Sequence, residues 1–264
     1  MATGSQQRAN YSDDFDGSWY IDTFYSKVEG CEEEGDFLAF MLNALHEVFR
    51  TGNITAKILL DVGTGPTIHS VISACPYVQE IYLSDVAESN RNILQDWCDG
   101  KRQHGRELCK FVLGLESDML KQTVDDRFTQ IRQKVKTILP IDVTKIPPIS
   151  VDDKLTADLI ISSLCFEAAC QSVEEYNKIV QNISSLLTSG GHIVLVGVLE
   201  ETFYRVGNFR FGCLKINKSD IQHAYTSQGF EIKTWKEFIP PPRNEVEAEF
   251  SDFQKAFVMH AVKK

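Results

Sequence analysis

The sequence predicts an α/β fold with a doubly wound, mainly parallel sheet. The first observation is the stretch 57–67, in which four apolar residues run into a Gly-x-Gly turn, as a buried strand does before a crossover helix. The second is an alternation of strand-like and helix-like segments that continues to residue 196. The third is that acidic residues end three of the predicted strands, where open α/β sheets bind their ligands.

Two segments precede the first strand. Residues 1–35 are polar and acid-rich around an aromatic cluster at 19–25. This cluster indicates either a helix that packs its rings on the core or a lid that excludes water from a site. Apolar residues at helical spacing then predict an amphipathic helix over 36–50.

Hydrophobic spacing predicts the order of the core elements. Short apolar runs between turn residues indicate strands, and apolar residues every three or four positions indicate helices. The pattern from 99 to 118 is weak, so we expect a loop there. The predicted strands are 57–62, 80–85, 138–143, 157–163, 193–196, 232–238 and 253–262, and the predicted helices are 66–75, 88–98, 121–136, 173–187 and 219–227.

The C-terminal third has a different rhythm. Two short strands around a Gly-Asn turn predict a hairpin over 203–211, inserted before the last helix. We expect Gly190 and Gly191 to end the helix before the fifth strand, and Ser219 to cap the last helix. The acidic, proline-containing linker 240–251 is expected to be exposed.

Composition limits the classes of partner. The net charge of -10 and the pI of 5.1 argue against binding to a phosphate backbone, so we expect no nucleic-acid partner. Seven cysteines without a Cys-x-x-Cys pair predict reduced thiols and neither a disulfide framework nor a metal site. No segment resembles a signal peptide or a membrane span, so we expect a cytoplasmic protein with no membrane partner.

The glycine turn carries the first functional signal. The motif Asp-x-Gly-x-Gly begins at Asp61, whereas a dinucleotide fingerprint would also need a glycine at Ile68. Asp85 lies twenty residues after the second glycine, the spacing at which a carboxylate accepts ribose hydroxyls. An ordinary tight turn and a helix N-cap are the alternatives for these two features. Asp142 ends the third predicted strand and is a candidate adenine contact.

Several longer segments resemble one family. They are 19–25, 60–68, 139–143, 165–168, 190–192 and 200–204. The chain resembles the small-molecule N-methyltransferases that act on nicotinamide, phenylethanolamine and indolethylamine or thioethers. This resemblance implies a class I S-adenosylmethionine (AdoMet) methyltransferase fold, a Rossmann-like, seven-stranded, mostly parallel sheet flanked by helices. It implies one methyltransferase domain over 1–264, with a cap and entry helix at 1–50 and a core at 51–264 that carries a hairpin insert at about 200–217.

The resemblance also implies where the ligands bind. AdoMet would be the methyl donor, and a small amine or a pyridine would be the acceptor, in a protein that we expect to be monomeric. The residues implied for the cofactor are Tyr20, Tyr25, Gly63, Thr64, Gly65, Thr67, His69, Asp85, Asn90, Asp142, Val143 and Ser163. Those implied for the acceptor are Tyr20, Leu164, Ala168, Tyr204 and Asp252, with Glu167 and Glu201 as the catalytic pair.

Departures from the family pattern bear on the acceptor. His69 stands where the family usually has tyrosine, and Thr188-Ser189 replaces a usual Lys-Pro. Gly197 and Cys213 stand where the nicotinamide enzyme has an aspartate and a serine in its substrate pocket. These changes favour an acceptor like that of the phenylethanolamine enzyme over nicotinamide.

Methyl transfer from a sulfonium to an amine is an in-line displacement that depends on alignment in a water-poor pocket. Carboxylates near the nitrogen would stabilise its growing positive charge and could accept its proton. We therefore expect Glu167 and Glu201 to act on the acceptor, with Asp252 assisting and Phe166 and Tyr204 forming aromatic walls. Glu201 as a solvated surface charge, methylation of a pyridine nitrogen and a non-catalytic AdoMet-binding protein are the alternatives.

Overall fold

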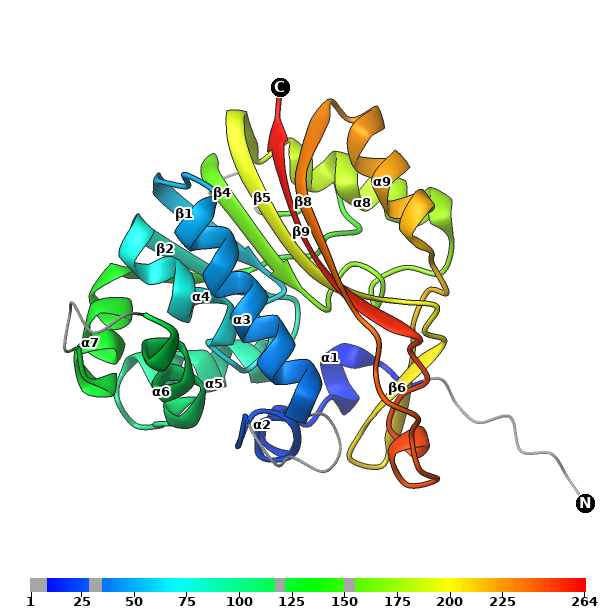
Figure 1. Cartoon of the computed structure of the whole chain (residues 1–264), viewed down its shortest axis with the longest axis horizontal. Helices are drawn as coiled ribbons and strands as arrows, with labels where there is room; N and C mark the ends of the chain where they lie inside the picture. Colours follow the sequence, from blue (N-terminus) through cyan, green and yellow to red (C-terminus); the bar gives the residue numbers. More distant parts are fainter. Residues whose placement is uncertain (1–8, 29–34, 117–121, 150–154) are drawn as a thin grey trace, which may run out of the picture.

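The computed structural model describes residues 9–28, 35–116, 122–149 and 155–264. Its centre is a seven-stranded sheet in the order β3-β2-β1-β4-β5-β9-β8 (Figure 1). All pairs from β3 to β5 are parallel, whereas β9 runs antiparallel to both of its neighbours. The predicted seven-stranded, mostly parallel sheet is therefore confirmed. The strands are β1 (Ala56–Val62), β2 (Val78–Asp85), β3 (Val135–Pro140), β4 (Ala157–Ser163), β5 (Leu187–Leu199), β8 (Phe230–Phe238) and β9 (Lys255–Lys263).

Helices cover both faces of this sheet (Figure 1). Successive side chains of a strand point to opposite faces, so Leu59 joins one hydrophobic cluster and Leu60 joins the other. The first cluster lies under α3 (Gly35–Thr51), α4 (His69–Ala74), α5 (Glu88–Cys98), α6 (Arg106–Leu115) and α7 (Val124–Lys134). The second lies under α8 (Val173–Ser184) and α9 (Lys218–Ser227).

The N-terminal helices and the hairpin lie together at the carboxyl edge of the parallel strands (Figure 1). The helices are α1 (Tyr11–Asp14) and α2 (Gly17–Phe24), and the hairpin strands are β6 (Phe203–Val206) and β7 (Phe209–Gly212). Phe15, Val206 and Phe211 are buried against one another. This packing stabilises the hairpin, because an isolated two-stranded hairpin is only marginally stable. The predicted hairpin is confirmed, while parts of the expected cap, 1–8 and 29–34, lie outside the described residues.

Three sequence expectations about elements are wrong. The expected loop at 99–118 contains α6, whose buried Leu108, Cys109 and Val112 follow helical spacing but extend for only 10 residues. Strand β3 ends at Pro140 rather than Val143, so Asp142 lies beyond the strand in a turn. Helix α8 ends at Ser184, and the two glycines expected to stop it lie inside the longer strand β5.

Smaller boundary differences have local causes. The crossover helix begins at His69, after the cavity-lining turn, rather than at residue 66. The cap of α9 is Asn217, whose side chain accepts from the Asp220 amide at 3.1 Å, rather than Ser219. Most of the linker 240–251 is exposed, as predicted, although it contains the short 3₁₀ helix η2 (Glu247–Glu249).

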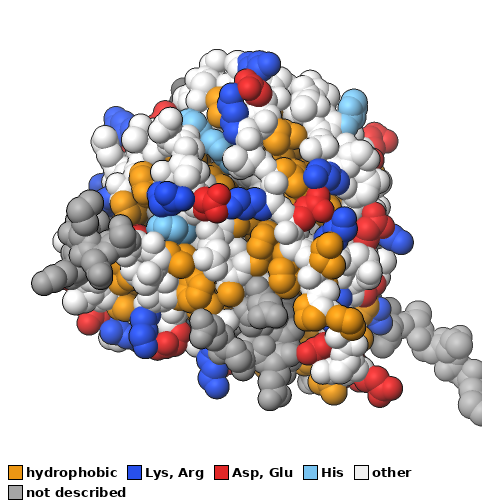
Figure 2. Space-filling model, viewed as in Figure 1, with side chains coloured by type: hydrophobic (Ala, Val, Ile, Leu, Met, Phe, Trp, Pro, Cys, Tyr) orange, Lys and Arg blue, Asp and Glu red, His pale blue; other side chains and the backbone are white. Residues whose placement is uncertain are grey.

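The surface and the cysteines agree with an ordinary globular chain. On the face seen in Figure 2, acidic and basic side chains are interspersed, without a continuous basic patch among the described residues. Six cysteines in the described part of the chain are free thiols, while Cys31 lies outside it. None of the described helices is both long enough and apolar enough to cross a membrane.

Candidate active site

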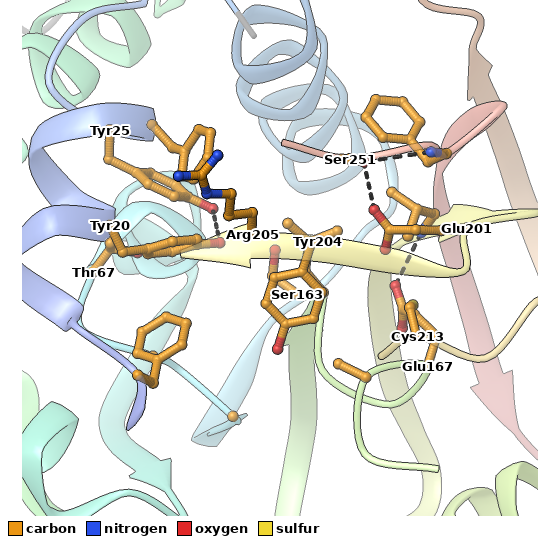
Figure 3. A pocket seen from close by; sticks show the side chains of 18 of the residues that line it. Tyr20, Tyr25, Thr67, Ser163, Glu167, Glu201, Tyr204, Arg205, Cys213 and Ser251 are labelled. Carbon is orange, nitrogen blue, oxygen red and sulfur yellow. Dashed lines mark hydrogen bonds between the residues drawn. The ribbon is translucent and has the colours of Figure 1, made fainter. Parts of the chain in front are cut away.

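Two adjoining cavities open at the carboxyl edge of the sheet. The first has a volume of about 810 Å³ and extends from the glycine turn to the hairpin (Figure 3). The second, of about 1190 Å³, extends over the ends of β2 and β3. Both are lined by Tyr11, Gly63, Leu164, Ala168 and Tyr204, so they are two parts of one site.

The glycine turn forms the floor between the cavities. Gly63 and Gly65 have φ of +68° and +65°, a conformation that glycine adopts without strain. A Cβ on Gly63 would lie 2.8 Å from the Cβ of Cys165 and closer still to its sulfur. Around Gly65 there is open space on that side. Gly63 is therefore required both for the turn and for the close approach of Cys165.

The acids at the ends of β1 and β2 support this turn from below. Asp61 accepts a short hydrogen bond from Ser70, and its other carboxylate oxygen is buried without a partner among the described residues. Burial raises the pKa of Asp61 to about 7. Asp85 accepts from the amides of Gly65 at 2.9 Å and Ala87 at 2.8 Å. Desolvation still raises the pKa of Asp85 above its ordinary value.

Asp85 faces the second cavity, where a cofactor ribose was expected. It is not the N-cap of α5, because the cap residue is Ala87. Asn90 donates to Asp85 at 3.3 Å and to the Tyr11 hydroxyl at 3.0 Å. The amide oxygen of Asn90 is buried without a described partner. Asn90 lines neither cavity and acts here through Asp85 and Tyr11.

Asp142 and Val143 line the far end of the second cavity. One Asp142 oxygen accepts from the amide and the hydroxyl of Thr144 at 3.0 and 2.6 Å. The turn backbone is also held by a bond from the Asp142 amide to the Pro148 carbonyl at 2.9 Å. Thus Asp142 shapes its own turn while its remaining oxygen is available to a ligand.

Aromatic side chains of α2 close the first cavity on one side. The hydroxyls of Tyr20 and Tyr25 are 3.4 Å apart, and Figure 3 shows both beside the cavity with Thr67. The Tyr25 ring packs at 4.9 Å from the ring of His69. Phe24, which lies between Tyr20 and Tyr25 in the sequence, is buried in the first hydrophobic cluster. The aromatic cluster therefore packs on the core and lines the cavity at once.

The opposite wall carries two buried carboxylates. Glu167 is 3% exposed and accepts from the Val198 amide at 3.0 Å. Burial raises the pKa of this carboxyl to about 7. A Cβ on Gly197 would lie 2.7 Å from the Phe257 ring and 3.0 Å from the Glu167 carboxylate. The glycine thus makes room for Glu167 to occupy this wall.

Glu201 is the second carboxylate, and it is 6% exposed. It accepts from the Ser251 hydroxyl at 2.6 Å, as drawn in Figure 3. Burial and the neighbouring Glu201 raise the pKa of the Cys213 thiol, which keeps it protonated. The burial of Glu201 excludes the alternative that it is a solvated surface charge.

Two expected members of this wall lie elsewhere. Asp252 lines neither cavity, and its carboxylate accepts from the Thr202 amide at 2.7 Å and the Phe203 amide at 3.3 Å, which anchors the hairpin. Phe166 is fully buried in the second core cluster and packs on Tyr176, so the expectation that it lines the pocket is wrong.

The remaining predicted residues do line the site. The first cavity brings together Tyr20, Tyr25, Gly63, Thr64, Gly65, Thr67, His69, Ser163, Leu164, Glu167, Ala168, Glu201 and Tyr204. Leu164 and Glu200, at the exits of β4 and β5, have φ of +55° and +60°, a left-handed conformation that is uncommon for residues other than glycine.

Sequence reasoning missed Tyr11, Ser251 and Arg205, which also line the first cavity. Tyr11 belongs to a helix of four residues, too short to show periodicity. Ser251 becomes important only through Glu201, 50 positions away. Arg205 was missed because an arginine in a hairpin is expected to be an exposed surface charge.

Comparisons with known proteins agree with this geometry. Residues 4–264 match the NNMT/PNMT/TEMT family. Indolethylamine N-methyltransferase of Oryctolagus cuniculus is 32% identical over 218 residues, which cover 81% of each chain. Phenylethanolamine N-methyltransferase of Mus musculus is 28% identical over 86% of this chain and 78% of its own. Nicotinamide N-methyltransferase of Homo sapiens is 28% identical over 90% of both chains.

Solved structures share the fold at low identity. Magnesium protoporphyrin IX methyltransferase of Synechocystis, with bound S-adenosylhomocysteine, has a TM-score of 0.55 at 12% identity and covers 94% of this chain and 93% of its own. N-methyltransferase NodS of Bradyrhizobium japonicum, in complex with S-adenosylhomocysteine, has a TM-score of 0.52 at 10% identity and covers 94% and 92%. The predicted class I methyltransferase fold is confirmed.

Proposed function

Because the chain belongs to the NNMT/PNMT/TEMT family, we propose that it transfers the methyl group of AdoMet to the nitrogen of a small phenylethylamine-like or indolethylamine-like amine. The observation that carries the choice of acceptor is the pair of buried carboxylates, Glu167 and Glu201, on one wall of the first cavity. Carboxylates in a desolvated pocket stabilise the positive charge that develops on nitrogen, and they can accept the proton that an alkylamine, unlike a pyridine, loses.

The described residues fit AdoMet. The carboxylate of Asp85 has spare lone pairs beyond its two amide bonds, so it can accept the ribose hydroxyls, with Asn90 behind it. Asp142 and Val143 would flank the adenine in the second cavity. The methionine end would lie over the glycine turn, near Tyr20 and Tyr25.

AdoMet supplies an electrophilic methyl group: the nitrogen lone pair forms a new C–N bond as the C–S bond breaks and its electrons remain on sulfur. Aromatic side chains of the cap exclude water and align the amine with the methyl. Glu201 stabilises the positive charge that develops on nitrogen and accepts the departing proton. Glu167, whose pKa is about 7, adds to the negative field in its ionised form, which becomes more abundant as the pH rises through neutrality. Ser251 holds Glu201 in place.

Gly197 supports an alkylamine over nicotinamide. The nicotinamide enzyme has an aspartate at this position, and here a side chain would meet Phe257 and the Glu167 carboxylate. The cavity wall therefore presents Glu167 instead of a carboxylate from position 197. Nicotinamide or another pyridine is the second candidate. Its methylation would leave the proton-accepting role of Glu201 unused, because a pyridine nitrogen has no proton to lose.

A screen of AdoMet-dependent product formation across phenylethylamines, tryptamine, thioethers and nicotinamide tests the acceptor. We expect an alkylamine to be methylated best, at a rate that rises with pH as the amine deprotonates. Nicotinamide as the best substrate, with a flat pH profile, would overturn the preference. Absence of AdoMet binding in a calorimetric titration would contradict the methyltransferase function, whereas AdoMet binding without methylation of any acceptor would favour a non-catalytic AdoMet-binding protein.

Glu201→Gln tests the role of the acceptor wall. We expect kcat to fall by about 10² to 10⁴, the usual range for general acid–base groups, with AdoMet affinity unchanged. Glu200→Gln is the matched control, because Glu200 pairs with Lys215 at 3.6 Å outside the cavities. Unchanged kcat/KM for every accepted amine in Glu201→Gln would remove this residue from the mechanism.

We further infer a monomeric, cytoplasmic enzyme without a nucleic-acid partner. The net charge of -10 supports the absence of a nucleic-acid partner, and the free thiols of the described cysteines support a cytoplasmic location. Light scattering at micromolar concentration, cell fractionation and the absence of a mobility shift with nucleic acid would test its three parts.

A further inference from the structure

The histidine of the first cavity is bonded at both ring nitrogens. His69 Nδ1 is 2.5 Å from the Thr67 hydroxyl, and Nε2 is 3.0 Å from the Ser163 hydroxyl. Ser163 in turn donates to the sulfur of Met41 at 3.6 Å. His69 is 3% exposed, and both hydroxyl residues line the cavity with it. Four side chains from three elements and a turn therefore form one buried polar chain.

The direction of this chain follows from its last member. The Met41 thioether can only accept, so the Ser163 proton points to Met41 and the Ser163 oxygen must accept from His69 Nε2–H. Nδ1 is then an acceptor for the Thr67 hydroxyl proton. The opposite tautomer would leave the buried Thr67 proton without a partner in this chain, which costs free energy.

In this arrangement every proton of the chain is used in a hydrogen bond within the chain. The oxygens of Thr67 and Ser163 are left with lone pairs only, and both residues face the cavity beside Tyr204 and Tyr20 in Figure 3. Such a surface suits a cationic donor and repels a carboxylate. The methionine end of AdoMet offers one of each, an α-ammonium and a carboxylate.

We propose that His69 is a positioning residue that holds the Thr67 and Ser163 oxygens as acceptors for the α-ammonium group of AdoMet. This proposal rests on the proposed function and specifies how the donor is recognised. His69 acts through Thr67 and Ser163, and it stands at a position where the family usually has a tyrosine.

The imidazole must stay neutral for this role, because an imidazolium would donate at both nitrogens and reverse the Thr67 bond. Burial lowers the pKa of His69 to about 3, so it is neutral at physiological pH. The aromatic ring of Tyr25 at 4.9 Å supplies further apolar surroundings.

Two ligands that differ only at the α-ammonium test the proposal by calorimetry. They are S-adenosylhomocysteine and its deamino analogue, which keeps the carboxylate. The wild-type chain is expected to bind the first at least tenfold more tightly. His69→Phe should reduce this preference to threefold or less, and His69→Gln, which keeps one acceptor and one donor, should restore part of it. His260→Phe removes an equally buried histidine that bonds His192 at 2.9 Å outside the cavities, and it should keep the full preference.

The preference between the ligands separates positioning from folding, since a packing defect weakens both equally. An unchanged preference in His69→Phe would overturn the proposal while leaving the function intact. If that variant does not fold, imidazole nitrogen NMR of the wild-type protein decides, and an Nδ1–H tautomer would overturn it. Failure of the wild-type chain to bind either ligand would overturn the proposed function itself.

Discussion

Glu167→Gln should change how the stability of the protein depends on pH. The carboxyl is 3% exposed, and its pKa is raised from 4.5 to about 7 by desolvation. An acid with a higher pKa in the folded state binds its proton there first, so stability is greatest at low pH and falls as the pH rises from about 4.5 to 7. Glutamine stays neutral and can still accept from the Val198 amide.

The size of the effect follows from the shift. A difference of roughly 2.5 pKa units corresponds to about 3 kcal/mol between pH 4 and pH 8, an upper value because the buried site can relax. We expect the free energy of unfolding of the wild-type protein to fall by about 1–3 kcal/mol more than that of the variant over this interval. Asp61, whose pKa is also about 7, contributes equally to both proteins and cancels.

Urea unfolding of both proteins at half-unit pH steps measures this difference directly. The difference curve should be flat below pH 4.5, decline through neutral pH and level off near pH 8. A flat difference throughout would refute the reasoning, because it would mean that burial does not raise the pKa of Glu167 in the folded protein. Glu175→Gln, which alters an exposed glutamate of α8, serves as the control for a generic change of charge.

Three further changes test the turn, the hairpin and the core. Gly63→Ala should weaken AdoMet binding more than tenfold in calorimetry and Gly65→Ala less, because both have positive φ but only the first Cβ clashes; equal losses would contradict this. Asp252→Ala should cost about 1–2 kcal/mol in urea unfolding and raise the acceptor KM without changing AdoMet affinity, since it frees the hairpin; an unchanged acceptor KM would contradict it. Arg127→Met removes a fully buried guanidinium that donates to the Ile72 carbonyl at 2.7 Å, and should cost about 3 kcal/mol with kcat/KM unchanged; a loss below 1 kcal/mol would show that the site relaxes.

Most of the framework could be predicted because its signals are local. The strand before the glycine turn, the helix over 36–50 and the Gly-Asn hairpin each have their period or turn chemistry within a few residues. Helix α6 was missed because its amphipathic pattern, although clear, extends over only 10 residues. The start of strand β3 was misplaced because β3 is an edge strand whose first residues, such as Lys136, are polar and exposed.

The sequence by itself determined which glycine and acidic residues lie together at the carboxyl edge of the sheet. The glycines follow β1, Asp85 ends β2 and Asp142 lies in the turn after β3, and parallel strands bring such positions to one edge whatever the rest of the chain does. It also determined the family, since the matching segments run through the whole chain.

Only the tertiary structure brought Glu167 and Glu201 to one cavity wall and His69 into contact with Thr67 and Ser163. Glu201 meets Ser251 across 50 positions, and His69 meets Ser163 across 94. Gly197 gains its meaning from the Phe257 ring and Glu167 that fill its space. Asp252 and Phe166, plausible by position, point to the hairpin and the core instead. Such contacts depend on the packing of distant segments, and no local period or motif encodes them.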